Sequence, residues 1–83
     1  MADIIIDNVY WEIKSPQGKD KNTIKHNLQN ADKQSENVII DLYRCGLEDE
    51  VAINRIKHEF TRLKSLRKLK IITKNKEIFE ISK

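Results

Sequence analysis

Asn37-Val38-Ile39-Ile40-Asp41-Leu42-Tyr43 is the stretch that decides the fold of this 83-residue chain. Its apolar residues follow one another without the alternation of a half-exposed strand, which is typical of a central strand covered on both faces. A strand of this kind needs strand neighbours at its sides and other elements packed over its faces. We therefore interpret the rest of the chain as the elements that surround residues 37–43.

Two strands near the N-terminus are expected to form an antiparallel hairpin. Residues 4–6 are a β-branched run, residues 7–8 fit a tight turn, and residues 9–14 alternate in polarity. The alternation divides the second strand into two faces, one with Val9, Trp11 and Ile13 and the other with Tyr10, Glu12 and Lys14. Trp11 is therefore expected in the core rather than on a base-stacking surface.

The central strand is expected to lie between two helices in the sequence. The first helix is predicted to begin after a cap at Asp20 or Asn22 and to end near Gln34, and the second to run from about Glu48 to Ser65. The residues expected in the core are Ile24, Leu28 and Ala31 from the first helix, and Val51, Ala52, Ile56, Phe60 and Leu63 from the second.

Residues 69–73 and 77–81 are predicted to form a closing hairpin around residues 74–76. The order is then ββαβαββ, and the predicted fold is a single α+β domain over residues 1–83 with two helices on a central sheet. The chain carries one cysteine, Cys45, so no internal disulfide can form and apolar packing must stabilise the fold. No run approaches the ~20 apolar residues that span a bilayer.

The charge pattern points to a polyanionic partner. The net charge is +3, and residues 55–70 hold seven Lys or Arg against the single acid Glu59. Such a basic run suits nucleic acid, whose binding releases counterions, although a solvated helix face explains the charges equally well. No Cys/His spacing fits zinc, no glycine loop fits a phosphate cradle, and no nucleophile triad is visible.

Glu12 and Lys14 remain as the core of a candidate site, because a carboxylate and an ammonium share one face of a strand. In a metal-dependent nuclease, Asp3 or Asp7 with Glu12 would hold a divalent cation such as Mg²⁺, and Lys14 would orient water. Gln34 is then an auxiliary residue.

A metal-free ribonuclease makes different demands on the same residues. Attack by the RNA 2′-hydroxyl on phosphorus needs cations, hydrogen-bond donors and proton transfer. The residues that fit these roles are Lys14 and Arg44 at the phosphate, Thr73 or Thr23 as donor, and Glu12 or His26 for proton transfer. Glu12 could also be structural and only hold Lys14 in place.

Four segments of the chain also resemble a known family. They are ADIIIDNVYWEIKSPQGK, AxKQSENVIIDL, AINxIKxEF and LKIITK. Together they resemble the C-terminal tRNase toxin domain of contact-dependent growth inhibition proteins, over nearly the whole chain. The resemblance implies the barnase/EndoU/colicin/RelE-like group, which cleaves RNA, often tRNA, without metal. It also implies a cognate immunity protein, delivery as part of a larger toxin, and action in the cytoplasm of the target cell.

Carried over residue by residue, the family pattern marks Lys14, Gln34, Arg44 and Thr73 as site candidates. This chain departs from it at Tyr43, where the resemblance leads us to expect an arginine. Phosphate binding then falls on Arg44 alone, or Tyr43 stacks on a base.

The sequence thus predicts a metal-free RNA-cleaving toxin domain, monomeric and without membrane insertion, and leaves a metal-dependent nuclease as the alternative. The predicted catalytic residues are Lys14, Arg44, Thr73, Glu12 and Gln34, and the predicted substrate-binding residues are Thr23, His26, Tyr43, Arg55 and Arg62. A non-catalytic RNA- or protein-binding adaptor and an antitoxin-like partner are the rival classes.

Overall fold

The fold was analysed in a computed structural model, which describes residues 3–83 except for the side chains of Asp3 and Lys21. The elements in chain order are β1 (Asp3–Ile6), β2 (Val9–Lys14), α1 (Lys21–Gln34), β3 (Asn37–Asp41), α2 (Asp49–Arg62), β4 (Lys68–Ile72) and β5 (Ile78–Ser82). This is the predicted ββαβαββ order of an α+β domain, which is confirmed.

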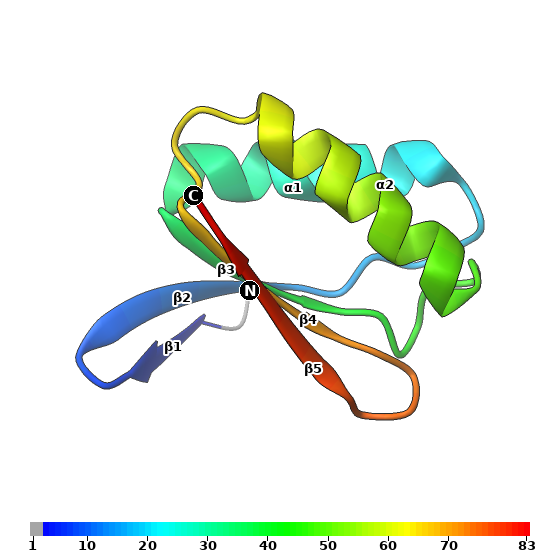
Figure 1. The fold of residues 1–83 in the computed structure, drawn as a ribbon, viewed down its shortest axis with the longest axis horizontal. Helices are drawn as coiled ribbons and strands as arrows, with labels where there is room; N and C mark the ends of the chain where they lie inside the picture. The colour runs from blue at the N-terminus through cyan, green and yellow to red at the C-terminus, as the bar shows by residue number, and fades with distance from the viewer. Residues whose placement is uncertain (1–2) are drawn as a thin grey trace.

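The five strands form one mixed sheet in the order β1-β2-β3-β4-β5. The three inner strands are parallel, and the antiparallel partners β1 and β5 lie at the two edges. Both helices cover the same face of the sheet, and the β1–β2 hairpin projects beyond them (Figure 1). The described helices include none long and apolar enough to cross a bilayer.

Local sequence signals explain the N-terminal half of the fold. Asp7 and Asn8 have positive φ angles of 52° and 66°, the conformation that a two-residue hairpin turn requires. The carboxylate of Asp20 caps α1 by accepting a hydrogen bond from the backbone N–H of Asn22 at 2.8 Å. The predicted turn and helix cap are thus both confirmed.

Two elements are shorter than predicted, in each case because an aspartate binds backbone N–H groups. β3 ends at Asp41, whose carboxylate accepts the N–H of Tyr43 at 3.0 Å and turns the chain. α2 ends at Arg62 rather than Ser65. The carboxylate of Asp32 in α1 accepts the N–H groups of Ser65 and Leu66, each at 2.9 Å, and holds the following loop against α1.

The main core lies between the helices and the sheet. Its fully or nearly fully buried members are Ile24, Leu28, Ala31, Val38, Ile40, Leu42, Cys45, Ala52, Ile56, Phe60, Leu66, Leu69 and Ile71. β3 is covered on both faces as predicted, since Ile39 is also buried on the opposite side. Val51 and Leu63, which were expected in the core, are only half-buried at its margin.

Trp11 is buried as predicted, but the face of β2 that meets the helices is the one with Glu12 and Lys14. Glu12 pairs with Val38 and Lys14 with Ile40, and both partners belong to the core under the helices. Glu12 and Lys14 therefore face the helices, whereas Trp11 faces the side that the helices leave open. On that side the ammonium of Lys70 lies 4.9 Å from the centroid of the Trp11 ring, in a cation–π contact.

Ile40→Ala should destabilise the domain by about 2–5 kcal/mol, since the side chain is fully buried in the central strand and truncation leaves a cavity. Urea unfolding followed by circular dichroism measures the change. The matched control is Ile5→Ala, because Ile5 is 69% exposed and should lose well under ~1 kcal/mol. Equal losses at the two positions would contradict the assignment of β3 as the buried centre.

Candidate functional site

The candidate site is built on β2, beneath the C-terminal end of α1. Glu12 is 1% exposed, so its carboxylate lies inside the protein. The ammonium of Lys14 lies 3.5 Å from Glu12 Oε1, and 12% of the Lys14 side chain is exposed. A buried carboxylate is costly unless it is paired or bound, so this position needs a compensating partner.

Tyr10 and Gln34 complete the cluster. The hydroxyl of Tyr10 donates to Glu12 Oε2 at 3.0 Å, and Lys14 Nζ donates to Gln34 Oε1 at 3.4 Å. Gln34 is the last residue of α1, so the end of this helix and β2 together form the cluster.

The two carboxylate oxygens of Glu12 differ in what they contact. Oε2 accepts the Tyr10 hydroxyl, whereas Oε1 accepts no hydrogen bond from any described residue. Its 3.5 Å separation from Lys14 Nζ is an ion pair without hydrogen-bond geometry. Oε1 is thus a buried anionic oxygen with capacity to bind a cation.

Asp3 and Asp7, the other candidate metal ligands, lie at opposite ends of β1. The backbone register pairs Asp3 with Glu12, while the side chain of Asp3 lies outside the described part of the chain. Asp7 sits in the hairpin turn, beyond the Ile6–Val9 pair, and is exposed. Asp7 is therefore wrongly placed to share a metal with Glu12. The described side chains contain no cluster of three His, Cys, Asp or Glu that could hold a metal.

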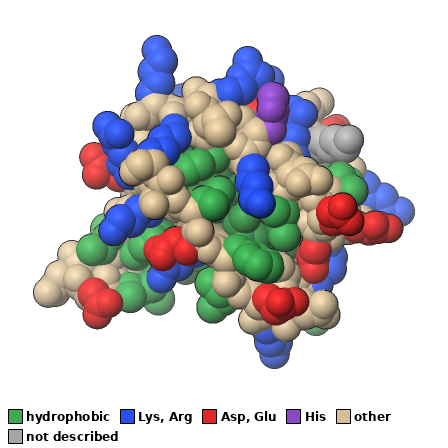
Figure 2. Space-filling model, in the orientation of Figure 1, with side chains coloured by type: hydrophobic (Ala, Val, Ile, Leu, Met, Phe, Trp, Pro, Cys, Tyr) green, Lys and Arg blue, Asp and Glu red, His purple; other side chains and the backbone are tan. Residues whose placement is uncertain are grey.

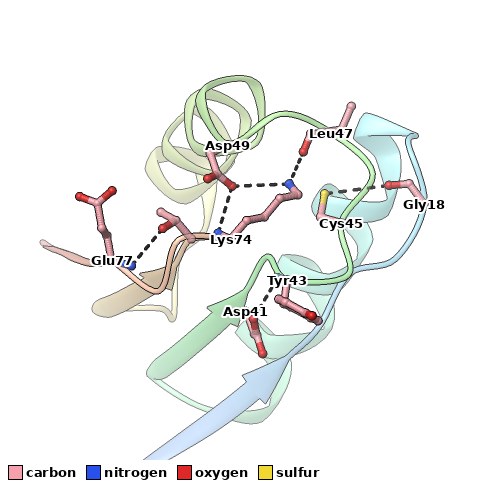
Figure 3. A network of polar contacts seen from close by, with 9 residues as sticks. Gly18, Asp41, Tyr43, Cys45, Leu47, Asp49, Lys74 and Glu77 are labelled. Atoms are coloured by element: carbon pink, nitrogen blue, oxygen red, sulfur yellow. Dashed lines mark hydrogen bonds and ion pairs between the residues drawn. The ribbon is translucent and has the colours of Figure 1, made fainter.

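Arg44 and Thr73 follow the carboxyl ends of β3 and β4, at the same edge of the parallel strands as Lys14 at the end of β2. Tyr43 and Arg44 are exposed in the turn after β3, and Tyr43 is 69% exposed. Thr73 is buried in the β4–β5 hairpin, where its hydroxyl accepts the N–H of Glu77 at 3.1 Å. Figure 3 shows Tyr43 and Glu77 among the polar contacts at this end of the strands.

The same end of the sheet has a structural network of its own. The Lys74 ammonium binds the carbonyl of Leu47 and lies 3.5 Å from Asp49 Oδ1, and the Cys45 thiol lies 4.0 Å from the carbonyl of Gly18 (Figure 3). Within the predicted group, Lys14 and Gln34 are therefore in contact, whereas Thr73 is held by the backbone of its own hairpin.

The remaining substrate-binding candidates are scattered. His26 is exposed on α1, and Thr23 is half-buried with its carbonyl accepting the Asn27 amide at 2.8 Å. Arg55 lies 3.1 Å from the buried carboxylate of Glu59, four residues along α2, which gives it a structural role. Arg62 is exposed and lines a pocket of about 520 Å³ with Lys33 and Lys64, where α1 and α2 end.

The basic run does not form one surface. Its first members lie on α2, Lys64 and Arg67 lie in the following loop, and Lys68 and Lys70 lie on β4. Lys70 contacts Trp11 on the face of the sheet opposite the helices. Sequence reasoning did not predict that Tyr10 binds Glu12. Its position two residues before Glu12 was the available signal.

A larger pocket, about 690 Å³, lies elsewhere, between α2 and β5, with Thr73 among its lining residues. We place the candidate site at Glu12 rather than in this pocket. The reason is chemical, because among the described side chains only the Glu12 cluster combines a buried carboxylate oxygen without a hydrogen bond, an adjacent ammonium and an amide.

Comparisons with known proteins give two matches. Residues 1–78 match the model of the family described as the contact-dependent growth inhibition CdiA C-terminal domain. A solved CdiA-CT/CdiI toxin and immunity complex from Burkholderia pseudomallei is 17% identical, with a TM-score of 0.69 over 88% of this chain and 55% of that chain. The chain thus spans about half the length of that protein, and the likeness concerns the fold. A search of curated proteins gave no match.

Lys14→Met should destabilise the domain by about 3 kcal/mol, because it leaves the carboxylate of Glu12 buried without its cation. The double variant Glu12→Gln with Lys14→Met should recover part of that loss, since it removes both charges. A double-mutant cycle in urea measures the coupling. Additive losses from the two single variants would show that the pair contributes nothing to folding.

Proposed function

The chain belongs to the family of contact-dependent growth inhibition CdiA C-terminal domains, and we propose that this growth-inhibiting toxin domain is a nuclease that cleaves RNA at the Glu12 cluster. The observation that carries the proposal is Glu12 Oε1, a buried carboxylate oxygen that accepts no hydrogen bond although an ammonium lies 3.5 Å away. A purely structural pair would gain stability by closing that hydrogen bond.

The cluster supports the metal-dependent alternative better than the metal-free mechanism. Glu12 Oε1 would hold a hard divalent cation such as Mg²⁺, with Asp3, paired to Glu12 in the backbone register, as the second candidate ligand. When bound, such a cation polarises the scissile phosphate and lowers the pKa of water. The metal-free mechanism, by contrast, needs Arg44 and Thr73 to act at a phosphate with Lys14, and the Thr73 hydroxyl already accepts the backbone N–H of Glu77.

The residues of the chain take distinct roles in this mechanism. Tyr10 holds Oε2 of Glu12 through its hydroxyl and so orients the carboxylate, with Oε1 left for the cation. Lys14 places a positive charge beside the phosphate and orients the attacking water, while Gln34 positions the Lys14 ammonium. Water attacks phosphorus, one ester P–O bond breaks, and the departing oxygen takes up a proton. The products are a hydroxyl end and a phosphate monoester end.

The proposed binding surface for the RNA backbone is a basic pocket where α1 and α2 end. Lys33 precedes Gln34 at the end of α1, and together with Arg62 and Lys64 it lines the 520 Å³ pocket. Three cations around one concave surface suit the phosphates of an RNA strand. tRNA is the favoured substrate, on the strength of the resemblance in the sequence.

The family also supports proposals about the biological setting. We propose that the domain is delivered as part of a larger protein, acts in the cytoplasm of a target cell, and is neutralised by a cognate immunity protein. The B. pseudomallei neighbour was solved together with its immunity protein, which supports such a partner. A non-catalytic adaptor would not need a carboxylate in the position of Glu12.

Purified domain should cleave total bacterial RNA in Mg²⁺ or Mn²⁺ and stop in EDTA, with hydroxyl and phosphate-monoester ends at the cut. Glu12→Gln should lower the rate by at least ~100-fold, because it keeps the volume of the side chain and removes the charge that holds the cation. Gel analysis with end mapping gives the rate and the chemistry. Lys14→Arg tests the second residue while retaining the charge that pairs with Glu12.

Arg44→Ala is the matched control, since Arg44 is exposed in a turn outside the cluster, and it should change the rate by less than ~10-fold. If cleavage persists in EDTA and leaves a 2′,3′-cyclic phosphate, the metal-dependent mechanism is wrong and the metal-free one applies. A wild-type chain that leaves RNA intact and is harmless when expressed in bacteria would remove the nuclease proposal.

Tyr10→Phe should weaken the apparent affinity for Mn²⁺ by about 10-fold, the low end for losing a hydrogen bond to a charged group, because Tyr10 is 41% exposed. Cleavage should return toward the wild-type rate at saturating Mn²⁺. A titration of the cleavage rate against Mn²⁺ separates a loss of Mn²⁺ affinity from a loss of the maximal rate. Tyr43→Phe is the control, as its hydroxyl lies in the turn after β3; equal effects at both tyrosines would exclude a positioning role for Tyr10.

A further inference from the structure

The 690 Å³ pocket between α2 and β5 is a groove with an apolar floor. Its apolar lining residues are Ile53, Ile71, Phe79 and Ile81. Phe79 is 47% exposed and, like Ile78 beside it in the edge strand β5, is a large apolar side chain in contact with solvent. Figure 2 shows hydrophobic side chains gathered in the middle of the face that contains α2 and β5.

The rim of the groove is acidic although the chain as a whole is basic. Its charged lining residues are Asp49, Glu50, Glu77 and Glu80 against the single cation Lys57. Asp49 is already paired with Lys74, but Glu50, Glu77 and Glu80 are exposed, and they lie on the helix side and the strand side of the groove. The net charge of the chain is +3, whereas the charged residues that line this groove are mostly acidic.

Charge and shape together exclude RNA as the occupant and favour a protein. Exposed carboxylates on both rims repel phosphates, and the apolar floor offers an RNA backbone nothing to bind. A protein segment with an apolar or aromatic anchor between lysine or arginine side chains complements both the floor and the rim.

We propose that this groove is where the cognate immunity protein docks, through a segment that inserts an apolar side chain flanked by basic ones. The inference rests on the proposed function in one respect, since it assumes such a partner. β5 lies three strands from β2, on the order of 14 Å across the sheet, so the docked segment contacts the groove without touching Glu12. Inhibition then comes from the bulk of the partner over the RNA path.

The test measures binding of the purified immunity protein to variants of the domain by isothermal titration calorimetry. Glu50→Lys with Glu80→Lys should weaken the Kd by about 10- to 100-fold, and Phe79→Ala should weaken it by a similar factor, because one change reverses the rim charge and the other removes part of the floor. Raising salt should weaken wild-type binding and have less effect on the charge-reversed variant.

Two variants outside the groove serve as controls. Glu36→Lys reverses an exposed charge near the opposite end of the sheet, and Glu12→Gln removes the charge of the catalytic carboxylate, and both should bind with the wild-type Kd. RNA cleavage by free Glu50→Lys with Glu80→Lys should match the wild type, which shows that the variant is folded.

The outcomes separate this inference from the function on which it rests. Unchanged Kd for all groove variants overturns the groove as the docking site while leaving the partner in place. Loss of binding in Glu12→Gln but not in the groove variants moves the interface to the catalytic cluster. If the wild-type domain binds no immunity protein, both the proposed partner and this inference are wrong. If binding depends on the groove but the domain does not cleave RNA, only the nuclease proposal is wrong.

Discussion

The parallel register between β2 and β3 is the constraint on which both the fold and the candidate site depend. It sets Glu12 beside Val38 and Lys14 beside Ile40, and so turns the polar face of β2 toward the helices. A slip of one residue would place Trp11 and Ile13 under α1 and carry Glu12 and Lys14 to the open face. The core would then gain two apolar side chains, and the contact with Gln34 would be lost.

This register carries an energetic cost that the rest of the domain must offset. A domain of this size leaves about 40% of the unfolded chain's surface exposed and has little stability to spare. It nevertheless buries the carboxylates of Glu12 and Glu59, each beside a cation from the same element. The Glu59 pair joins two residues one turn apart within α2. Around Glu12 are Tyr10 and Lys14 from β2 and, through Lys14, Gln34 from α1, so this cluster joins a strand to a helix.

Sequence reasoning predicted what depends on neighbours along the chain. The Asp7-Asn8 turn, the Asp20 cap and the apolar run of β3 all act within a few residues, and each was located correctly. The ends of β3 and α2 were misplaced because Asp41 and Asp32 bind backbone N–H groups, and an aspartate that ends an element by a hydrogen bond looks in sequence like any other polar residue. The candidate site was half predicted. Lys14 and Gln34 meet as expected, whereas Arg44 lies in the turn after β3 and Thr73 is tied into the β4–β5 hairpin.

The sequence by itself determined the order of the elements, the amphipathic faces of the helices and the identity of the central strand, since these follow from periodicity and local hydrogen bonds. It also placed Glu12 and Lys14 on one face of a strand. Only the tertiary structure decided which side of the sheet that face meets, because strand alternation is symmetric and the packing of α1 and α2 breaks the symmetry. The same packing buried the carboxylate of Glu12 beneath α1 and gathered acidic residues from α2 and the β5 hairpin into one groove.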